Sequence, residues 1–122
     1  MLIRKASFIL LELYSVFMNV LFVCNQNKNR SKTAEELFHK EFVTSSAGLY
    51  SEPSVREEQL QWADVVVVME DSQRYELGKR FPTQYLRKRI VSLNIPDVFQ
   101  YNQPELVELL KARIEETLLP LL

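Results

Sequence analysis

The chain has 122 residues and a formal net charge of -1, with 47% hydrophobic and 25% charged residues. This length suits one compact domain, and the composition is close to that of soluble globular proteins, which argues against a disordered or fibrous chain. A balanced charge provides no strong attraction to nucleic acid or to an anionic membrane, so we expect neither as a partner. One cysteine and one histidine exclude an intramolecular disulfide and an ordinary structural zinc site, and we expect no metal.

Residues 1–17 precede the first clear strand pattern and resemble a secretory leader only superficially. Glu12 interrupts their apolar run, no small-residue cleavage site follows, and the run is shorter than the roughly 20 apolar residues that cross a bilayer. We therefore expect a cytoplasmic protein. We also expect residues 1–17 to be a dispensable extension, with Met18 as a functional start and one domain over residues 18–122.

After Met18, short β-branched runs alternate with amphipathic patterns, which predicts a parallel sheet with helices on both faces. The expected strands are 20–23, 42–46, 65–69 and 89–93, and the expected helices are 31–41, 54–62, 71–81 and 104–118. The continuous apolar runs in the first and third strands are typical of central strands that are buried on both faces. The predicted fold class is therefore α/β, a three-layer α/β/α sandwich around a four-stranded parallel sheet.

Cys24 follows the first predicted strand and precedes the first predicted helix. Ligands of such sheets bind beyond the carboxyl ends of the strands, and N–H groups at a helix N-terminus bind anions. The same positive potential stabilises a thiolate, which makes Cys24 a candidate nucleophile. Arg30 comes six positions later, and its planar guanidinium is suited to holding two phosphoryl oxygens. The alternative is a buried structural thiol with Arg30 in a surface ion pair.

The loop between Cys24 and the helix contains no glycine, the usual residue at positive φ. Asparagine tolerates this geometry better than most other residues, and three asparagines are present. We therefore predict a phosphate loop between the first strand and the first helix. Its candidate substrate-binding residues are Asn25, Gln26, Asn27, Lys28, Asn29 and Ser31.

Two features later in the chain each allow two interpretations. One is a basic cluster, which either steers a phosphorylated ligand or is a solvated helix end: Lys79, Arg80, Arg87, Lys88 and Arg89. The other is Phe99, which either lines an aromatic substrate pocket or covers the end of the last helix.

The order Cys-x-x-x-x-x-Arg-Ser between a strand and a helix resembles the phosphate loop of the low-molecular-weight protein tyrosine phosphatases. Cys24, Arg30 and Ser31 match that motif. Segments 46–48 (Ser-Ala-Gly) and 69–72 (Met-Glu-Asp-Ser) also resemble segments of this family, so the resemblance extends over about residues 19–119.

Three positions around the loop depart from the family pattern, and the family's Asp-Pro pair is altered to Pro96-Asp97-Val98. Gln26 replaces a loop glycine, Asn29 replaces a second loop cysteine, and Lys32 replaces the proline after Arg-Ser. Without that second cysteine, no internal disulfide protects the candidate nucleophile from oxidation. The chain therefore resembles a shortened, divergent member of the family.

The resemblance implies a hydrolase that cleaves phosphomonoesters, expected to be a protein tyrosine phosphatase that forms a cysteinyl-phosphate intermediate without a cofactor. In this scheme Cys24 attacks phosphorus, Arg30 binds the phosphoryl group, and Asp97 is the general acid and later the general base. The implied substrates are phosphorylated proteins or small aryl phosphates, and the oligomeric state is left open.

The resemblance also implies supporting roles for other polar residues. Ser31 is expected to stabilise the thiolate, and Asn27, bonded to Ser46, is expected to hold the shape of the loop. Two other functions use the same loop: a non-catalytic phosphate-recognition module, and an arsenate reductase-like protein that would need an external thiol.

Overall fold

The computed structural model describes residues 18–121, so the expectations for residues 1–17 lie outside the described part. Within it, four parallel strands form one sheet in the order β2-β1-β3-β4. The strands are β1 (Asn19–Cys24), β2 (Val43–Gly48), β3 (Val65–Val68) and β4 (Arg89–Ser92). The predicted α/β class with a four-stranded parallel sheet is confirmed.

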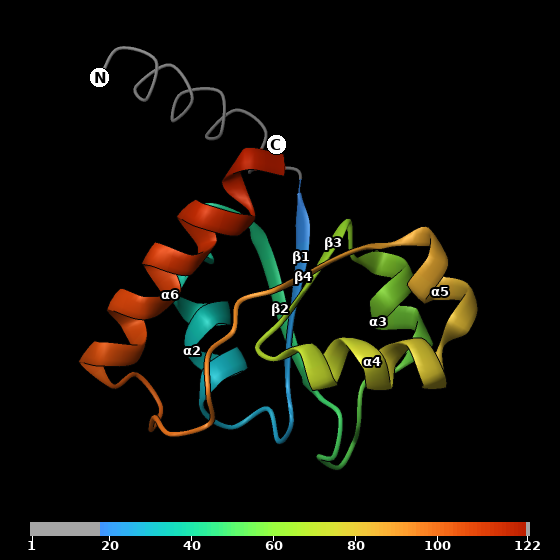
Figure 1. Cartoon of the computed structure of the whole chain (residues 1–122), viewed down its shortest axis with the longest axis horizontal. Helices are drawn as coiled ribbons and strands as arrows, with labels where there is room; N and C mark the ends of the chain where they lie inside the picture. Colours follow the sequence, from blue (N-terminus) through green and yellow to red (C-terminus); the bar gives the residue numbers. More distant parts are fainter. Residues whose placement is uncertain (1–17, 122) are drawn as a thin grey trace.

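Helices cover both faces of the sheet, as Figure 1 shows. They are α2 (Arg30–Leu37), α3 (Glu57–Trp62), α4 (Asp71–Arg80), α5 (Pro82–Arg87) and α6 (Pro104–Thr117), followed by the short 3-10 helix η1 (Leu119–Leu121). Helices α2 and α6 lie on one face, and α3, α4 and α5 lie on the other (Figure 1). Among residues 18–121, no helix is both long and apolar enough to cross a bilayer.

Two helix predictions need correction. The first helix ends at Leu37 instead of residue 41, because the chain turns at Phe38, whose carbonyl accepts hydrogen bonds from the N–H groups of Glu41 and Phe42. Helix α5 was not predicted, because Pro82 was interpreted only as the end of the preceding helix. Proline is also favoured at the first position of a helix, and Pro82 occupies that position in α5.

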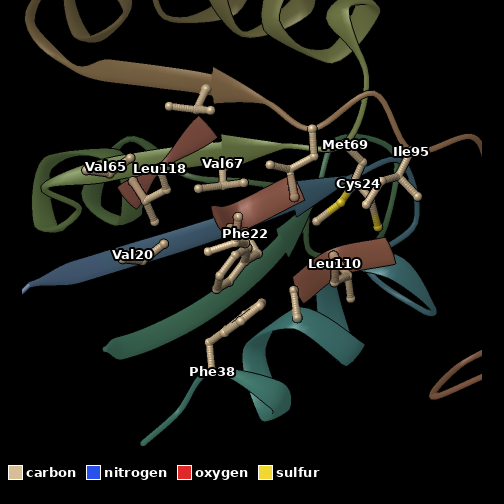
Figure 2. Packing of buried hydrophobic residues seen from close by; sticks show 14 of the residues in the cluster. Val20, Phe22, Cys24, Phe38, Val65, Val67, Met69, Ile95, Leu110 and Leu118 are labelled. Atoms are coloured by element: carbon tan, nitrogen blue, oxygen red, sulfur yellow. The ribbon is translucent and has the colours of Figure 1, made fainter. Parts of the chain in front are cut away.

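Side chains of β1 alternate between two hydrophobic clusters. Phe22 points toward α2 and α6, where its ring stacks on Phe38 with 5.9 Å between centroids, while Leu21 and Val23 pack with the helices of the other face. Figure 2 shows the first cluster, in which Leu110 of α6 also packs. Burying each large apolar side chain contributes about 1.5–3 kcal/mol, so the sheet is a firm base for the loops at its edge.

The strand order creates a place for a ligand. The chain leaves β1 toward β2 on one side, and it later continues through β3 and β4 on the other side. Loops that follow β1 and β3 therefore separate at the carboxyl edge of the sheet, which is where ligands bind in folds of this kind. Cys24 pairs with Gly48 at this edge, and the chain after β3 begins at Met69.

Candidate active site

Cys24 is the last residue of β1, and its side chain is buried. Its sulfur lies 2.9 Å from the Ser31 hydroxyl oxygen and accepts a hydrogen bond from the Asn27 backbone N–H at 3.2 Å. Figure 2 shows Cys24 beside Met69 and Ile95 at the carboxyl edge of the sheet. Donors directed at the sulfur stabilise a thiolate, so this environment suits a nucleophile.

The Ser31 hydroxyl lies within hydrogen-bond distance of two side chains, but it has only one proton to donate. Its oxygen donates to Oδ1 of Asn27 at 2.7 Å and also contacts the Cys24 sulfur. While Cys24 is a thiol, it can donate to Ser31 as Ser31 donates to Asn27. When Cys24 is a thiolate, the hydroxyl can rotate to donate to the sulfur. The structure thus brings Asn27 and Ser31 together around the Cys24 thiol.

The loop after Cys24 takes its shape from one asparagine in particular. Asn27 has a φ of 52°, in the left-handed region, whereas Asn29 has a φ of -115°. The side chain of Asn25 has another use, since its Oδ1 accepts a hydrogen bond of 3.1 Å from Nε2 of Gln73. Gln73 is buried and its Oε1 also accepts the N–H group of Met69, so the loop is tied to the β3–α4 turn.

Close backbone packing holds the other side of the loop. The N–H groups of Leu49 and Tyr50 donate to the carbonyls of Cys24 and Asn25 at 3.0 and 2.8 Å. At Gly48, a Cβ atom would lie only 2.9 Å from the backbone nitrogen of Asn27. Position 48 therefore needs glycine because the phosphate loop runs directly over it.

Arg30 begins α2 and is 1% exposed, so the alternative of a surface ion pair is wrong. Its Nη1 donates to Oε1 of Glu70 at 2.5 Å and to the carbonyl of Ile95 at 2.8 Å. Within the described residues its Nε has no hydrogen-bond partner, although it is buried. A buried donor left unpaired costs about 1–3 kcal/mol, and more when charged, so this nitrogen is available for an anion.

Asp97 reaches the site from the loop between β4 and α6. Its Oδ1 lies 3.7 Å from Nε of Arg30, which is close enough for an ion pair but too long for a hydrogen bond, and its side chain is 54% exposed. A carboxyl group here borders both the guanidinium and solvent. The sequence separates Asp97 from Cys24 by three strands, and the topology brings both to one edge.

Phe99 follows Asp97 but packs against the cluster that contains Leu106 and Leu110 of α6. The same cluster contains Cys24, so the role of Phe99 in a substrate pocket stays a prediction. Tyr101 is turned toward α2, where its hydroxyl donates to Oε2 of Glu36. That hydrogen bond, together with partial desolvation, raises the pKa of Tyr101 above its ordinary value, so the phenol keeps its proton.

The expected hydrogen bond between Asn27 and Ser46 is not the one in the structure. Ser46 donates to Oε1 of Glu35 on α2 at 2.7 Å, while Asn27 accepts from Ser31. A carboxylate is a stronger acceptor than an amide, and Glu35 lies on the helix that packs beside β2. Ser46 therefore ties β2 to α2 and supports the loop only indirectly.

The basic cluster is distributed over both edges of the sheet. Arg80 donates to the carbonyl of Leu49 near the site, whereas Arg89 begins β4 at the opposite edge. Lys88 donates to the carbonyl of Ala63 at 2.8 Å, beyond the end of α3. The five basic residues therefore do not gather at the candidate site, and ligand steering by the whole cluster stays a prediction.

A polar cavity of about 260 Å³ adjoins the phosphate loop. Its lining includes Gln26, Asn27, Ser46, Ser51, Glu52 and Arg56. Among residues 18–121, no three His, Cys, Asp or Glu side chains are grouped so that they could hold a metal ion. The described residues bring together a thiol, the Asn27 N–H group, a buried guanidinium and a carboxyl group.

Sequence reasoning assigned no role at the site to three residues that help to position it, namely Thr33, Glu35 and Gln73. Thr33 and Gln73 lie in the first turns of α2 and α4, where polar residues are common, and Glu35 lies in the second turn of α2. Thr33 and Gln73 differ from most polar residues at helix starts because their side chains are buried. The sequence pattern does not show which polar side chains will be buried.

A scan of models of protein families and a search of curated proteins both found no match to this chain. Solved structures do match. The low-molecular-weight protein tyrosine phosphatase from T. tengcongensis is 25% identical, with a TM-score of 0.61 over 81% of this chain and 99% of its own.

Two further structures are similar at lower identity. The tyrosine phosphatase Wzb from Escherichia coli K30, in complex with phosphate, is 16% identical, with a TM-score of 0.61 over 83% of this chain and 96% of its own. The YwlE arginine phosphatase from Geobacillus stearothermophilus is 20% identical, with a TM-score of 0.57 over 81% and 84%. The resemblance to the low-molecular-weight protein tyrosine phosphatases is thus confirmed in the fold, and the chain fits a shortened, divergent member.

Proposed function

We propose that this protein is a cysteine-dependent phosphomonoesterase of the low-molecular-weight protein tyrosine phosphatase type. The observation that carries the proposal is the buried Arg30, whose Nε has no hydrogen-bond partner in the described part of the chain and faces Asp97 at 3.7 Å. An arginine held this way by Glu70 and Ile95 is preorganised for an oxyanion. The similar folds are those of phosphatases, one of them in complex with phosphate.

The reaction has two steps, and the first transfers the phosphoryl group to the enzyme. The Cys24 thiolate attacks phosphorus in line, so a sulfur–phosphorus bond forms as the bond to the leaving oxygen breaks. Asp97 gives its proton to that oxygen. The N–H groups of loop 25–29 and the Arg30 guanidinium bind the phosphoryl oxygens. These donors stabilise the negative charge on the oxygens most strongly in the transition state.

The second step returns the enzyme to its starting state. The Asp97 carboxylate takes a proton from water, and the water oxygen attacks phosphorus while the sulfur–phosphorus bond breaks. Ser31 donates to the departing thiolate. Inorganic phosphate leaves, Cys24 is again a thiolate and Asp97 is again protonated.

We assign phosphotyrosine in proteins or small aryl phosphates as the substrates, in the cytoplasm. An aryl oxygen is a good leaving group, which suits a cysteine nucleophile with one general acid. A phosphate-recognition module and an arsenate reductase-like protein remain as outcomes of the test. The first would bind phosphate without turnover, and the second would need an added thiol.

The first experiment compares para-nitrophenyl phosphate turnover and phosphate binding by the wild type and Cys24→Ser. Turnover should be lost in the variant, while phosphate binding persists through Arg30 and the loop N–H groups. Turnover by Cys24→Ser within about tenfold of the wild type would contradict the covalent mechanism. A panel of phosphotyrosine and phosphoserine peptides then determines the preferred substrate.

The second experiment tests Asp97 with phenyl phosphates whose leaving groups differ in pKa. Asp97→Asn should slow poor leaving groups by roughly 10²–10⁴-fold and good ones less, because a good leaving group departs without a proton. Asp71→Asn is the matched control, since Asp71 is another exposed carboxylate and begins α4. Parallel leaving-group plots for wild type and Asp97→Asn would refute the acid role.

A further inference from the structure

The loop that carries Asp97 is fixed at its beginning by backbone hydrogen bonds, whereas its middle is exposed. At its beginning, the N–H groups of Leu93 and Ile95 donate to carbonyls of Val68 and Met69 at 3.0 and 2.8 Å. Asp97 itself is 54% exposed and lies 3.7 Å from the Arg30 guanidinium, which is longer than a hydrogen bond. A general acid must be placed to within a fraction of an ångström, so contacts elsewhere must hold this loop.

One buried hydroxyl joins this loop to the phosphate loop. Thr33 lies in the first turn of α2 and is 2% exposed. Its Oγ1 donates to the carbonyl of Asn29, the last phosphate-loop residue before α2, at 2.7 Å. The same oxygen accepts the backbone N–H of Asn102 at 2.8 Å. The hydroxyl therefore uses its proton and a lone pair to bridge two loops that are far apart in sequence.

The backbone at Asn102 is shaped for this contact. Asn102 has a φ of 56°, in the left-handed region that asparagine tolerates. Just before it, the N–H group of Gln100 donates to Oε1 of Gln103 at 2.9 Å, and the N–H group of Gln103 donates back to the carbonyl of Gln100. This closed turn leaves the Asn102 N–H group free to point at Thr33.

A second contact joins the same two elements one turn further along α2. The Tyr101 hydroxyl donates to the Glu36 carboxylate, and Glu36 comes three residues after Thr33. Residues three apart are neighbours on a helix surface, so both contacts lie along one side of α2. Arg30, three residues before Thr33, extends this row to the phosphoryl-binding group.

We infer that Thr33 and Glu36 are positioning residues, which set the Asp97 loop relative to Arg30 and the phosphate loop through Asn102 and Tyr101. This inference rests on the proposed function for its catalytic consequence. Loss of the Thr33 hydroxyl frees the end of the Asp97 loop while the thiol, the guanidinium and the loop N–H groups keep their places. Proton delivery to the leaving oxygen should then suffer more than phosphate binding.

The experiment compares Thr33→Val, which keeps the shape but removes the hydroxyl, with Thr33→Ser, which keeps the hydroxyl. Thr33→Val should lower kcat for phenyl phosphate about tenfold, steepen the leaving-group dependence and leave phosphate affinity within about twofold. Thr33→Ser should restore the wild-type dependence. An equal loss for all leaving groups in Thr33→Val, or equal behaviour of the two variants, would overturn the inference.

Amide hydrogen exchange provides a readout that does not depend on turnover. Exchange in residues 98–103 should be about tenfold faster in Thr33→Val than in Thr33→Ser, because the Asn102 N–H group loses its acceptor. If the wild type shows no turnover, the proposed function fails, and this comparison alone decides whether Thr33 holds the loop. Unchanged exchange would show that it does not.

Tyr101→Phe tests the second contact and serves if Thr33→Val does not fold, because Tyr101 is exposed. It should steepen the leaving-group dependence in the same direction and speed exchange in residues 98–103. Tyr75→Phe is the matched control, since Tyr75 is an exposed tyrosine on α4. The same result in both tyrosine variants would overturn the assignment of Glu36 and Tyr101.

Discussion

Arg30 combines full burial, a positive charge and a donor without a hydrogen-bond partner in the described part of the chain. Such a group is costly unless an anion completes it. Its two Nη1 contacts, to Glu70 and to the Ile95 carbonyl, fix the plane of the guanidinium and direct Nε at the site. Geometry, and not charge alone, is what this residue contributes.

We therefore predict that Arg30→Lys lowers kcat/KM for para-nitrophenyl phosphate by about 10²-fold or more, although the charge is kept. A lysine lacks the planar fork and cannot contact Glu70, Ile95 and a phosphoryl oxygen together. Arg113→Lys on α6 is the matched control, because the described contact of the Arg113 side chain is a pair with Glu116 at the surface. Steady-state kinetics check this, and wild-type values for Arg30→Lys would mean that the anion binds elsewhere.

At Asn27, backbone conformation and side-chain bonding are separable. Both Asn27→Gly and Asn27→Ala remove the hydrogen bond from Ser31, but only glycine accepts a φ of 52° without strain. We expect Asn27→Ala to be less stable than Asn27→Gly by about 1–2 kcal/mol in urea unfolding. Equal stability of the two variants would mean that the left-handed backbone does not constrain position 27.

The phosphate loop and the end of β2 act as one element, because the loop backbone crosses directly over Gly48. We predict that Gly48→Ala reduces both turnover and stability, since its Cβ would lie 2.9 Å from the Asn27 nitrogen, a backbone atom that cannot move aside alone. Thermal unfolding and kinetics measure the two effects.

Gly78→Ala in α4 is the control for that substitution. There the new Cβ would lie 3.2 Å from the ring of Tyr85, a side chain that can shift. Because glycine in a helix interior is unfavourable by roughly 0.5–1 kcal/mol, this control should be neutral or more stable. If Gly48→Ala behaves like Gly78→Ala, the close approach does not constrain the loop.

At the scale of the molecule, Met18 is the first residue that the structure describes, and it packs against the first hydrophobic cluster. We propose that deletion of residues 1–17 leaves melting temperature and turnover close to those of the full chain. Deletion of residues 1–19 should be destabilising, because it removes the Met18 carbonyl that accepts the N–H of Val43 and the N–H of Asn19 that donates to Asp64. A large loss of solubility or activity in the shorter deletion would contradict this.

The fold class could be predicted because its signals are local. The apolar runs of β1 and β3 are long enough to identify buried strands, and the alternation of strands and helices leaves few topologies. Helix α5 was missed because a proline is compatible with both the end and the start of a helix. Loop asparagines indicated a left-handed residue, and only the backbone showed that it is Asn27.

The sequence by itself determined the class of the sheet, the loop from Cys24 to Arg30 and the residue types of the candidate site. The tertiary structure alone decided the partners of those residues. Arg30 meets Glu70 and Ile95, which lie 40 and 65 positions away, and Ser46 turns to Glu35 instead of Asn27. Parallel strands require crossovers, so residues that share the carboxyl edge are distant in the chain, and hydrogen-bond partners there depend on packing that local pattern does not encode.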